Sequence, residues 1–140
     1  MTQAIAYLAF DGTCADAMRF YERALGGKLE VLMSGADSPL KDQMPQEFQH
    51  RILHARLVLP GGGMLYAGDA PAHVPYQGIH GVGIAVDFDT VDEAQRVFAA
   101  LSEGGQVSMP LQPAFWAKAW GMCTDRFGTP WIVNGEQIPI

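Results

Sequence analysis

Cysteine is scarce in this sequence: the 140 residues include 2 cysteines, Cys14 and Cys123. Two thiols are too few for the disulfide framework that small secreted domains need, so we expect a reduced, cytoplasmic protein with structural cysteines. Long hydrophobic runs are also missing, since no apolar stretch approaches the ~18 residues of a membrane-spanning helix. Met1 is not followed by a basic region and an apolar stretch, so we expect no signal peptide and no membrane partner.

Positive charge is in short supply as well. The chain has 9 Lys and Arg against 15 Asp and Glu, with a formal net charge of −6 and a pI of about 5.0. Because an acidic surface repels phosphate backbones, nucleic acid is not expected as a partner. Hydrophobic residues make up 49% of the chain, which is typical of a globular protein. The length suits one domain, here residues 1–140.

The strongest signal in the sequence is an internal repeat. Two segments superpose at a constant offset, matching Thr13 with Thr90, Asp16 with Glu93, Ala17 with Ala94, Arg19 with Arg96, and Tyr21 with Phe98. Each begins with a capping box, Thr-x-x-Asp or Thr-x-x-Glu, which predicts the start of a helix. A Gly-Gly pair follows each segment and predicts a left-handed residue at the helix end. Apolar residues in both segments follow the spacing of an amphipathic helix that lies on a sheet.

Strand patterns surround both predicted helices in the same order. They are expected at residues 5–10, 28–33, 52–59, 64–69, 82–88, 106–111, 117–123 and 131–134. The order β-α-β-β-β therefore occurs twice, in modules 1–70 and 79–140, and predicts an α+β fold with mixed or antiparallel sheets. Residues 34–49 are polar, contain two prolines and are expected to form a loop or flap. Residues 70–78 are expected to link the modules.

Strand alternation separates two faces of each predicted sheet. One face of 52–59 is apolar and should meet the helix, whereas the other presents His54 and Arg56. In the later strand, small residues alternate with Trp116, Lys118 and Trp120. We therefore predict a ligand pocket lined by His54, Arg56, Trp116, Lys118 and Trp120, suited to a planar or anionic small molecule. The alternative is that this face is a dimer interface or is merely solvated.

Several motifs resemble the glyoxalase/bleomycin-resistance (vicinal oxygen chelate) superfamily and, within it, the PhnB-like branch, often labelled 3-demethylubiquinone-9 3-methyltransferase. They are YLAF at 7–10, CADA at 14–17, FY at 20–21 with LG at 25–26, FWA at 115–117 and TDRFGTPWIVN at 124–134. The resemblance implies paired βαβββ modules whose sheets form a cup, and usually a homodimer. The methyltransferase label finds no support, because no glycine-rich loop between a strand and a helix is present to hold S-adenosylmethionine.

The superfamily's enzymes bind a divalent metal through His, Gln or Glu side chains from four strands. The resemblance places three of these positions at Ala6 (Tyr7 if the register slips), Gly81 and Ile132, with His80 beside Gly81. Ala6, Gly81 and Ile132 carry no donor atom, so we expect no metal cofactor. The other histidines, His50, His54 and His73, form no HExxH or other familiar metal motif.

Three further side chains are weaker candidates. Cys14 lies at the start of a predicted helix, where the helix dipole lowers a thiol pKa, and could be a nucleophile, although packing is the plainer interpretation. Asp69 and Asp125 end strands and could meet a ligand or form turns.

The leading hypothesis is a metal-free, homodimeric small-molecule-binding protein. The alternatives are a metal-dependent isomerase, lyase or transferase of the glyoxalase type, and a pure dimerisation module.

Overall fold

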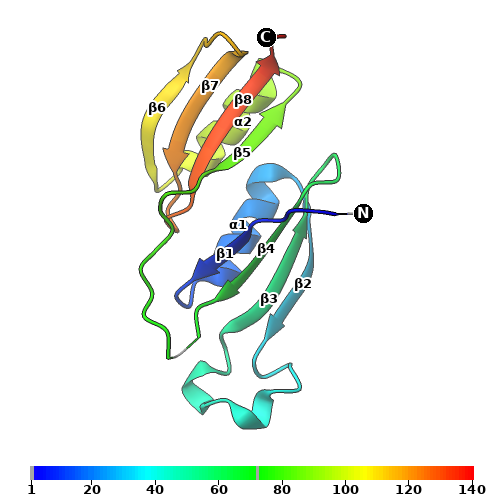
Figure 1. The fold of residues 1–140 in the computed structure, drawn as a ribbon, viewed down its shortest axis with the longest axis vertical. Helices are drawn as coiled ribbons and strands as arrows, with labels where there is room; N and C mark the ends of the chain where they lie inside the picture. Colours follow the sequence, from blue (N-terminus) through cyan, green and yellow to red (C-terminus); the bar gives the residue numbers. More distant parts are fainter. Residues whose placement is uncertain (1, 72) are drawn as a thin grey trace. The chain divides into compact units, whose positions relative to one another are not determined.

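The computed structural model describes residues 2–71 and 73–140, which form two four-stranded sheets (Figure 1). The chain divides into two compact units, Met1–Gly78 and Ile79–Ile140, which we call module 1 and module 2. Within the described residues, neither of the α-helices, each 12 residues long, could cross a membrane.

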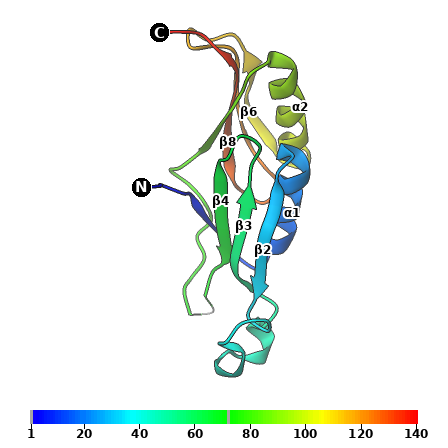
Figure 2. The same ribbon diagram turned by 90° about the vertical axis from the view of Figure 1, so that its right-hand side faces the viewer.

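Module 1 has the predicted β-α-β-β-β order, and its sheet order is β1-β4-β3-β2. Strand β1 is parallel to β4, whereas the other pairs are antiparallel. Helix α1 covers one face of this sheet (Figure 2). The elements are β1 (Tyr7–Phe10), α1 (Cys14–Leu25), β2 (Lys28–Ser34), two short 3₁₀ helices, η1 (Lys41–Gln43) and η2 (Gln46–Phe48), β3 (Ile52–Val58) and β4 (Met64–Asp69).

Module 2 repeats this topology, with the sheet order β5-β8-β7-β6 and β5 parallel to β8. Its elements are β5 (Ile84–Phe88), α2 (Val91–Ser102), β6 (Gln106–Gln112), β7 (Ala117–Thr124) and β8 (Pro130–Gln137). The α+β class and the two βαβββ modules are thus confirmed. Strand β8 runs beyond the predicted end at residue 134, because Gln137 still pairs with Ala117.

Each module has its own core between helix and sheet. In module 1 the fully buried side chains include Phe10, Met18, Tyr21 and Leu57. In module 2 they include Val97, Leu101, Trp131 and Val133. The small residues of β7 face α2 as predicted, and a Cβ added at Gly121 would lie 3.0 Å from the Phe98 ring. Close packing of a helix on this strand therefore depends on small side chains.

The Gly-Gly pairs play the same part in both modules. Gly26 and Gly104 have φ angles of 78° and 74°, the left-handed conformation that glycine adopts most easily. In α1 the left-handed glycine is the C-cap itself, whereas in α2 it follows an extended C-cap, Glu103. A side chain at Gly27 or Gly105 would collide with the backbone carbonyl of Val58 or Thr124, respectively.

The two helix starts differ from each other, and one prediction is wrong. Thr90 caps α2 as expected, with its Oγ1 accepting a hydrogen bond from the Glu93 backbone N–H at 3.1 Å. Thr13 makes no such bond. Instead, the Asp69 carboxylate accepts hydrogen bonds from the backbone N–H groups of Gly12 and Cys14, at 2.9 and 3.0 Å. A charged acceptor supplied by β4 takes the place of the local hydroxyl.

Candidate functional site

The face of the module 1 sheet that points away from α1 carries an aromatic cluster of Tyr7, His54 and Tyr66, which we call the Tyr7 cluster. Tyr7 pairs with Tyr66 in the β1–β4 ladder, and the β3–β4 register places His54 on the same face. The ring centroids of Tyr7 and His54 lie 6.1 Å apart, and those of His54 and Tyr66 lie 5.1 Å apart. The predicted pocket residue His54 therefore has two tyrosine neighbours that the sequence analysis did not include. Strict alternation along residues 64–69 could have pointed to Tyr66.

Arg56 lies beside the Tyr7 cluster and has few partners. Its guanidinium carbon is 5.8 Å from the centre of the Tyr66 ring, and its Nη1 lies 3.9 Å from Glu30 Oε1. That distance is too long for a hydrogen bond. The Nε atom of Arg56 is buried and has no hydrogen-bond partner among the described residues. Because 40% of the Arg56 side chain is exposed, its terminal N–H groups could donate to a ligand that reaches this face.

Tyr7 is held in place by backbone groups. Its hydroxyl donates to the Leu53 carbonyl oxygen at 2.9 Å. A Cβ at Gly68 would lie 2.7 Å from the Tyr7 hydroxyl oxygen, so glycine is required there for the ring to lie where it does. Burial, and to a smaller degree the nearby Cys14, raises the pKa of Tyr7. The phenol therefore stays protonated at neutral pH and acts as a donor to Leu53.

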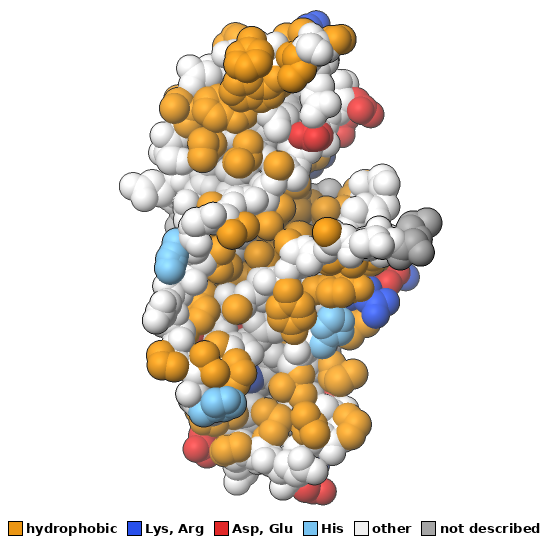
Figure 3. Space-filling model, viewed as in Figure 1, with side chains coloured by type: hydrophobic (Ala, Val, Ile, Leu, Met, Phe, Trp, Pro, Cys, Tyr) orange, Lys and Arg blue, Asp and Glu red, His pale blue; other side chains and the backbone are white. Residues whose placement is uncertain are grey.

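A hollow of about 550 Å³ opens beside the Tyr7 cluster, within module 1. This volume lies in the range of roughly 300–1,000 Å³ typical of small-molecule sites. On the face drawn in Figure 3, hydrophobic side chains gather over the part of module 1 where residues 35–51 lie. The predicted flap contributes five of the lining residues, namely Leu40, Gln43, Met44, Pro45 and Phe48. The remainder are Tyr7, Ala9, Arg51, Leu53, Gly68, Asp69, Ala70, Pro71 and His73.

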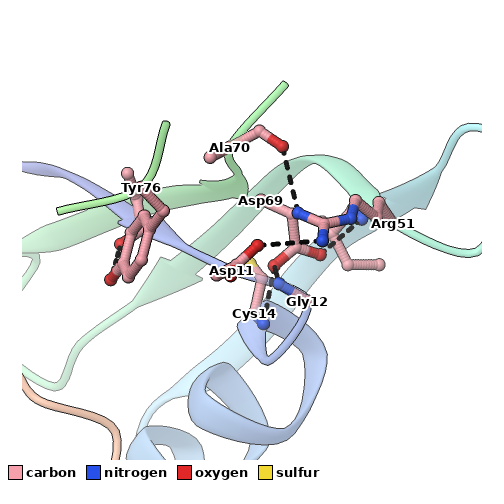
Figure 4. A network of polar contacts seen from close by, with 9 residues as sticks. Asp11, Gly12, Cys14, Arg51, Asp69, Ala70 and Tyr76 are labelled. Carbon is pink, nitrogen blue, oxygen red and sulfur yellow. Dashed lines mark hydrogen bonds and ion pairs between the residues drawn. The ribbon is translucent and has the colours of Figure 1, made fainter. Parts of the chain in front are cut away.

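A polar network forms one side of the hollow (Figure 4). The Arg51 guanidinium contacts Asp11 Oδ1 at 2.9 Å and donates to the Ala70 carbonyl at 3.2 Å. It also lies 5.0 Å from the centre of the Phe48 ring. Asp69 Oδ2 accepts a further hydrogen bond from the Ile52 backbone N–H at 2.8 Å. The network joins the start of α1 to β3 and β4.

Module 2 presents a second aromatic group on the face away from α2. Trp116 and Trp120 lie edge to face, with ring centroids 5.4 Å apart. Trp116 Nε1 donates to Asn134 Oδ1 at 3.1 Å, and Asn134 Nδ2 donates to Asp87 Oδ1 at 3.0 Å. These bonds fix the orientation of the Trp116 ring. Lys118 forms an ion pair with Glu136, so its charge is already matched.

The buried thiol and carboxyl candidates have structural surroundings. Cys14 is fully buried, and burial, together with the Asp69 charge, raises the pKa of its thiol to about 12. The favoured interpretation, that Cys14 packs in the core, agrees with this burial, whereas the alternative of a dipole-activated nucleophile does not, because desolvation and a nearby carboxylate raise the thiol pKa. Asp125 is 3% exposed and accepts from the Phe127 and Thr129 N–H groups and from Trp131 Nε1. It organises the β7–β8 turn.

The proteins that this chain resembles agree with the fold and the site geometry described above. A model of the glyoxalase/bleomycin resistance protein/dioxygenase superfamily matches residues 4–133. The chain belongs to this superfamily. Protein YjdN of Escherichia coli (strain K12) is 32% identical to it over 137 residues, which cover 91% of each protein.

Solved structures of the superfamily fold extend the comparison. The crystal structure of protein PA1353 from Pseudomonas aeruginosa has a TM-score of 0.89 at 45% identity, covering 99% of this chain and 100% of the other. The PhnB protein from Bacillus cereus, which carries the methyltransferase name, has a TM-score of 0.76 at 20% identity, covering 95% and 98%. A PhnB protein thus shares the fold, as the resemblance predicted.

The positions expected to hold the superfamily's metal carry no suitable donors in this chain. Ala6 precedes β1 and engages Tyr66 N–H through its carbonyl, Gly81 precedes β5, and Ile132 lies in β8 opposite Ala85. Tyr66 in β4 corresponds to Ile132 in β8. Each lies three residues before the last residue that pairs with the parallel strand, β1 or β5. Among residues 2–71 and 73–140, no three His, Cys, Asp or Glu side chains come together in a way that could hold a metal ion. These side chains do not fit the superfamily's divalent metal.

The five predicted pocket residues fall into two groups, each within one module. His54 and Arg56 lie together beside Tyr66, and Trp116 and Trp120 lie together with Lys118 on the same strand face. Neither group lines the hollow of module 1, which the sequence analysis missed. That all five line one ligand pocket stays a prediction.

Proposed function

We propose that this protein binds a small organic molecule and does so without the divalent metal that the superfamily's enzymes use. The observation that carries the proposal is the hollow of module 1 beside the Tyr7 cluster, whose size suits a small ligand. The absence of donor side chains at Ala6, Gly81 and Ile132 supports metal-free binding. His54, Arg56, Trp116, Lys118 and Trp120 lie outside the hollow, and we propose them as contacts for a ligand on the open sheet face of their own module, with the aromatic rings stacking on a planar group.

Metal content tests the proposal against the enzyme alternative. The protein is purified without chelator, and Ni, Zn, Mn and Fe are measured by mass spectrometry. We expect far less than one ion per chain. A stoichiometric metal that is lost in His54→Ala or His80→Ala would instead support a metal-dependent isomerase, lyase or transferase.

Ligand binding is tested by melting temperature across a panel of metabolites, because a ligand that binds only the folded state raises it. A panel in which no compound raises the melting temperature would favour a dimerisation module. For a ligand that binds the open sheet face of module 2, Trp116→Ala should weaken binding by ~1–3 kcal/mol. Trp116→Phe is the matched control, since it keeps an aromatic ring while losing the hydrogen bond to Asn134.

We also infer that the protein acts as a homodimer in the cytoplasm. The two free cysteines are buried, which suits a reducing compartment without requiring it.

Strand β6 is the last strand of its sheet, and its Val107 and Met109 are 45% and 36% exposed. An exposed edge strand presents unpaired backbone N–H and C=O groups that can pair with another chain. Light scattering should give about twice 15.2 kDa, and Val107→Lys should lower that mass whereas Val82→Lys, outside β6, should not. A clean monomer in the wild type would refute the dimer.

A further inference from the structure

The charged side chains around the module 1 hollow are already matched within the protein. The Arg51 guanidinium meets the Asp11 carboxylate at 2.9 Å, the Ala70 carbonyl at 3.2 Å and the face of Phe48. With 19% of its side chain exposed, Arg51 has little surface left for a ligand anion. A second anion here would compete with Asp11 for the same donors.

Asp69, the one carboxylate among the described residues that line the hollow, is equally occupied. Asp69 receives two backbone N–H groups on Oδ1 and one on Oδ2, at distances of 2.8 to 3.0 Å. A ligand cation would have to share these oxygens with the start of α1. The hollow therefore offers no charge of either sign that lacks a partner within the described part of the chain.

What remains on the wall is mainly apolar. Leu40, Met44, Phe48 and Leu53 line the hollow together with the ring of Tyr7. Gln43 and His73 are both exposed to solvent and add hydrogen-bonding groups at the rim. The Tyr7 oxygen donates its proton to Leu53 and keeps lone pairs that can accept a hydrogen bond from a ligand.

We infer that the hollow takes an uncharged, largely apolar small molecule, such as an aromatic ring system with one N–H or O–H donor directed at the Tyr7 oxygen. This inference rests on the proposed function and narrows it to one ligand class. Burying an ionised group among matched charges and apolar side chains would be costly, whereas an apolar ring loses only its contact with water. The weakly partnered Arg56 lies outside the hollow and does not alter its charge balance.

Two fluorescent probes with the same ring skeleton test the ligand class. N-phenylnaphthylamine is neutral and has one N–H, and anilinonaphthalenesulfonate adds a sulfonate to the same rings. We expect the neutral probe to bind at least about tenfold more tightly. Raising the salt concentration from about 50 to about 500 mM should leave its affinity unchanged, because no ion pair is formed. A sulfonate probe that binds as tightly, with affinity that falls in salt, would overturn the inference.

A matched pair of variants tests the place of binding. Leu40 lines the hollow and is 48% exposed, whereas Met33 lies outside it in the same module and is 39% exposed. Leu40→Lys should weaken the neutral probe about threefold or more and strengthen the sulfonate probe about fivefold, because it adds the unmatched cation that the wall lacks. Met33→Lys should change neither affinity by more than about twofold. The opposite pattern would place the probe on the open sheet face and overturn the assignment.

The outcomes also separate this inference from the proposed function. A metabolite that raises the melting temperature but is not displaced by N-phenylnaphthylamine would leave the proposed function standing and overturn the inference. Probe affinity that increases when the protein is diluted below its dimer dissociation point would show that a second copy covers the hollow, and would overturn it too.

Discussion

The two modules have the same topology, and each has a Gly-Gly pair after its helix, but different groups cap the first turns of the two helices. In module 2 the hydroxyl of Thr90 caps α2 from the adjacent position in the chain. In module 1 the equivalent Thr13 makes no capping bond, and the carboxylate of Asp69 reaches α1 from the end of β4. At the place in β8 that corresponds to Asp69, module 2 has Gly135.

Gly135 explains why module 2 cannot use the same arrangement. A Cβ at this position would lie 2.7 Å from the Cβ of Ala94 in α2. The helix therefore packs too closely on β8 to admit a carboxylate, and its first turn depends on a local cap. In module 1 the carboxylate fits, and it also binds the Ile52 N–H at the start of β3. The same fold thus ties helix and sheet together by a side chain in one module and by close packing in the other.

The Gly-Gly pair that follows the helix in both modules should give the largest losses of stability when its second glycine is substituted. Gly27→Ala and Gly105→Ala each place a methyl group against a backbone carbonyl, Val58 O or Thr124 O. We expect each to lower the free energy of unfolding by about 3–4 kcal/mol, measured by urea denaturation. Gly63→Ala is the control, since its nearest contact would be Leu59 Cδ1 at 3.7 Å, and it should change stability by less than about 0.5 kcal/mol. Unequal losses in the two modules would mean that they are less alike than the register indicates.

Asp69→Ala should come next, because it removes the acceptor for three backbone N–H groups. We expect a loss of about 2–3 kcal/mol in urea denaturation, typical of leaving donors of this kind without a charged partner. Asp16→Ala removes the carboxylate that the sequence suggested for the same end of α1. It should cost less than about 1 kcal/mol, the usual range of a helix-dipole contribution. A larger loss in Asp16→Ala than in Asp69→Ala would reverse our account of the cap.

The third effect is a loss of folding stability at alkaline pH, and it comes from the thiol of Cys14, whose backbone N–H donates to Asp69. The pKa of Cys14 is raised from 9.0 to about 12 by burial and by the Asp69 charge. The folded state therefore holds this proton more tightly than the unfolded chain does. Its contribution to stability is complete below about pH 9 and is lost as the pH rises towards 12. Cys14→Ala should flatten the pH dependence of the unfolding free energy in this window.

Alkylation with iodoacetamide, followed by mass spectrometry, gives an independent measure at pH ~8. Cys14 in the folded protein should react at least about a hundredfold more slowly than in the urea-unfolded chain, because both thiolate fraction and access are reduced. Cys123 in module 2, also buried and with a pKa raised mainly by burial, provides the comparison. Rapid labelling of folded Cys14 would contradict the raised pKa.

The smallest expected effect is the difference in stability loss between variants of Thr90 and Thr13, the threonines at the two helix starts. Thr90→Ala removes a side-chain cap and should cost about 1 kcal/mol in thermal or urea unfolding. Thr13→Ala removes no capping bond, so its cost should stay below about 0.5 kcal/mol. Equal losses from the two substitutions would show that Thr13 contributes to α1 in a way that its hydrogen bonds do not reveal.

Much of the fold could be predicted from local patterns. The strand at 64–69 and the helix from residue 91 follow from alternation, capping and glycine position, which depend on neighbours along the chain. The open face bearing His54 and Arg56 follows from the same alternation. The hollow could not be predicted, because its wall joins residues 40–53 to Tyr7 and Asp69. Such contacts depend on how strands pair and on how residues 34–51 fold back.

The sequence by itself determined the two modules, their order of elements and the face of each sheet that no helix covers. Each of these features depends on residue patterns that repeat over only a few positions. The tertiary structure decided which group caps α1, why Gly68 must lack a side chain, and that burial raises the pKa of the Cys14 thiol. These outcomes arise where residues far apart in the chain meet. Asp69, for example, is 57 positions from Gly12, whose backbone N–H donates to it. The Asp69 carboxylate takes the place of a local cap at Thr13, and burial, followed by the Asp69 charge, raises the pKa of Cys14.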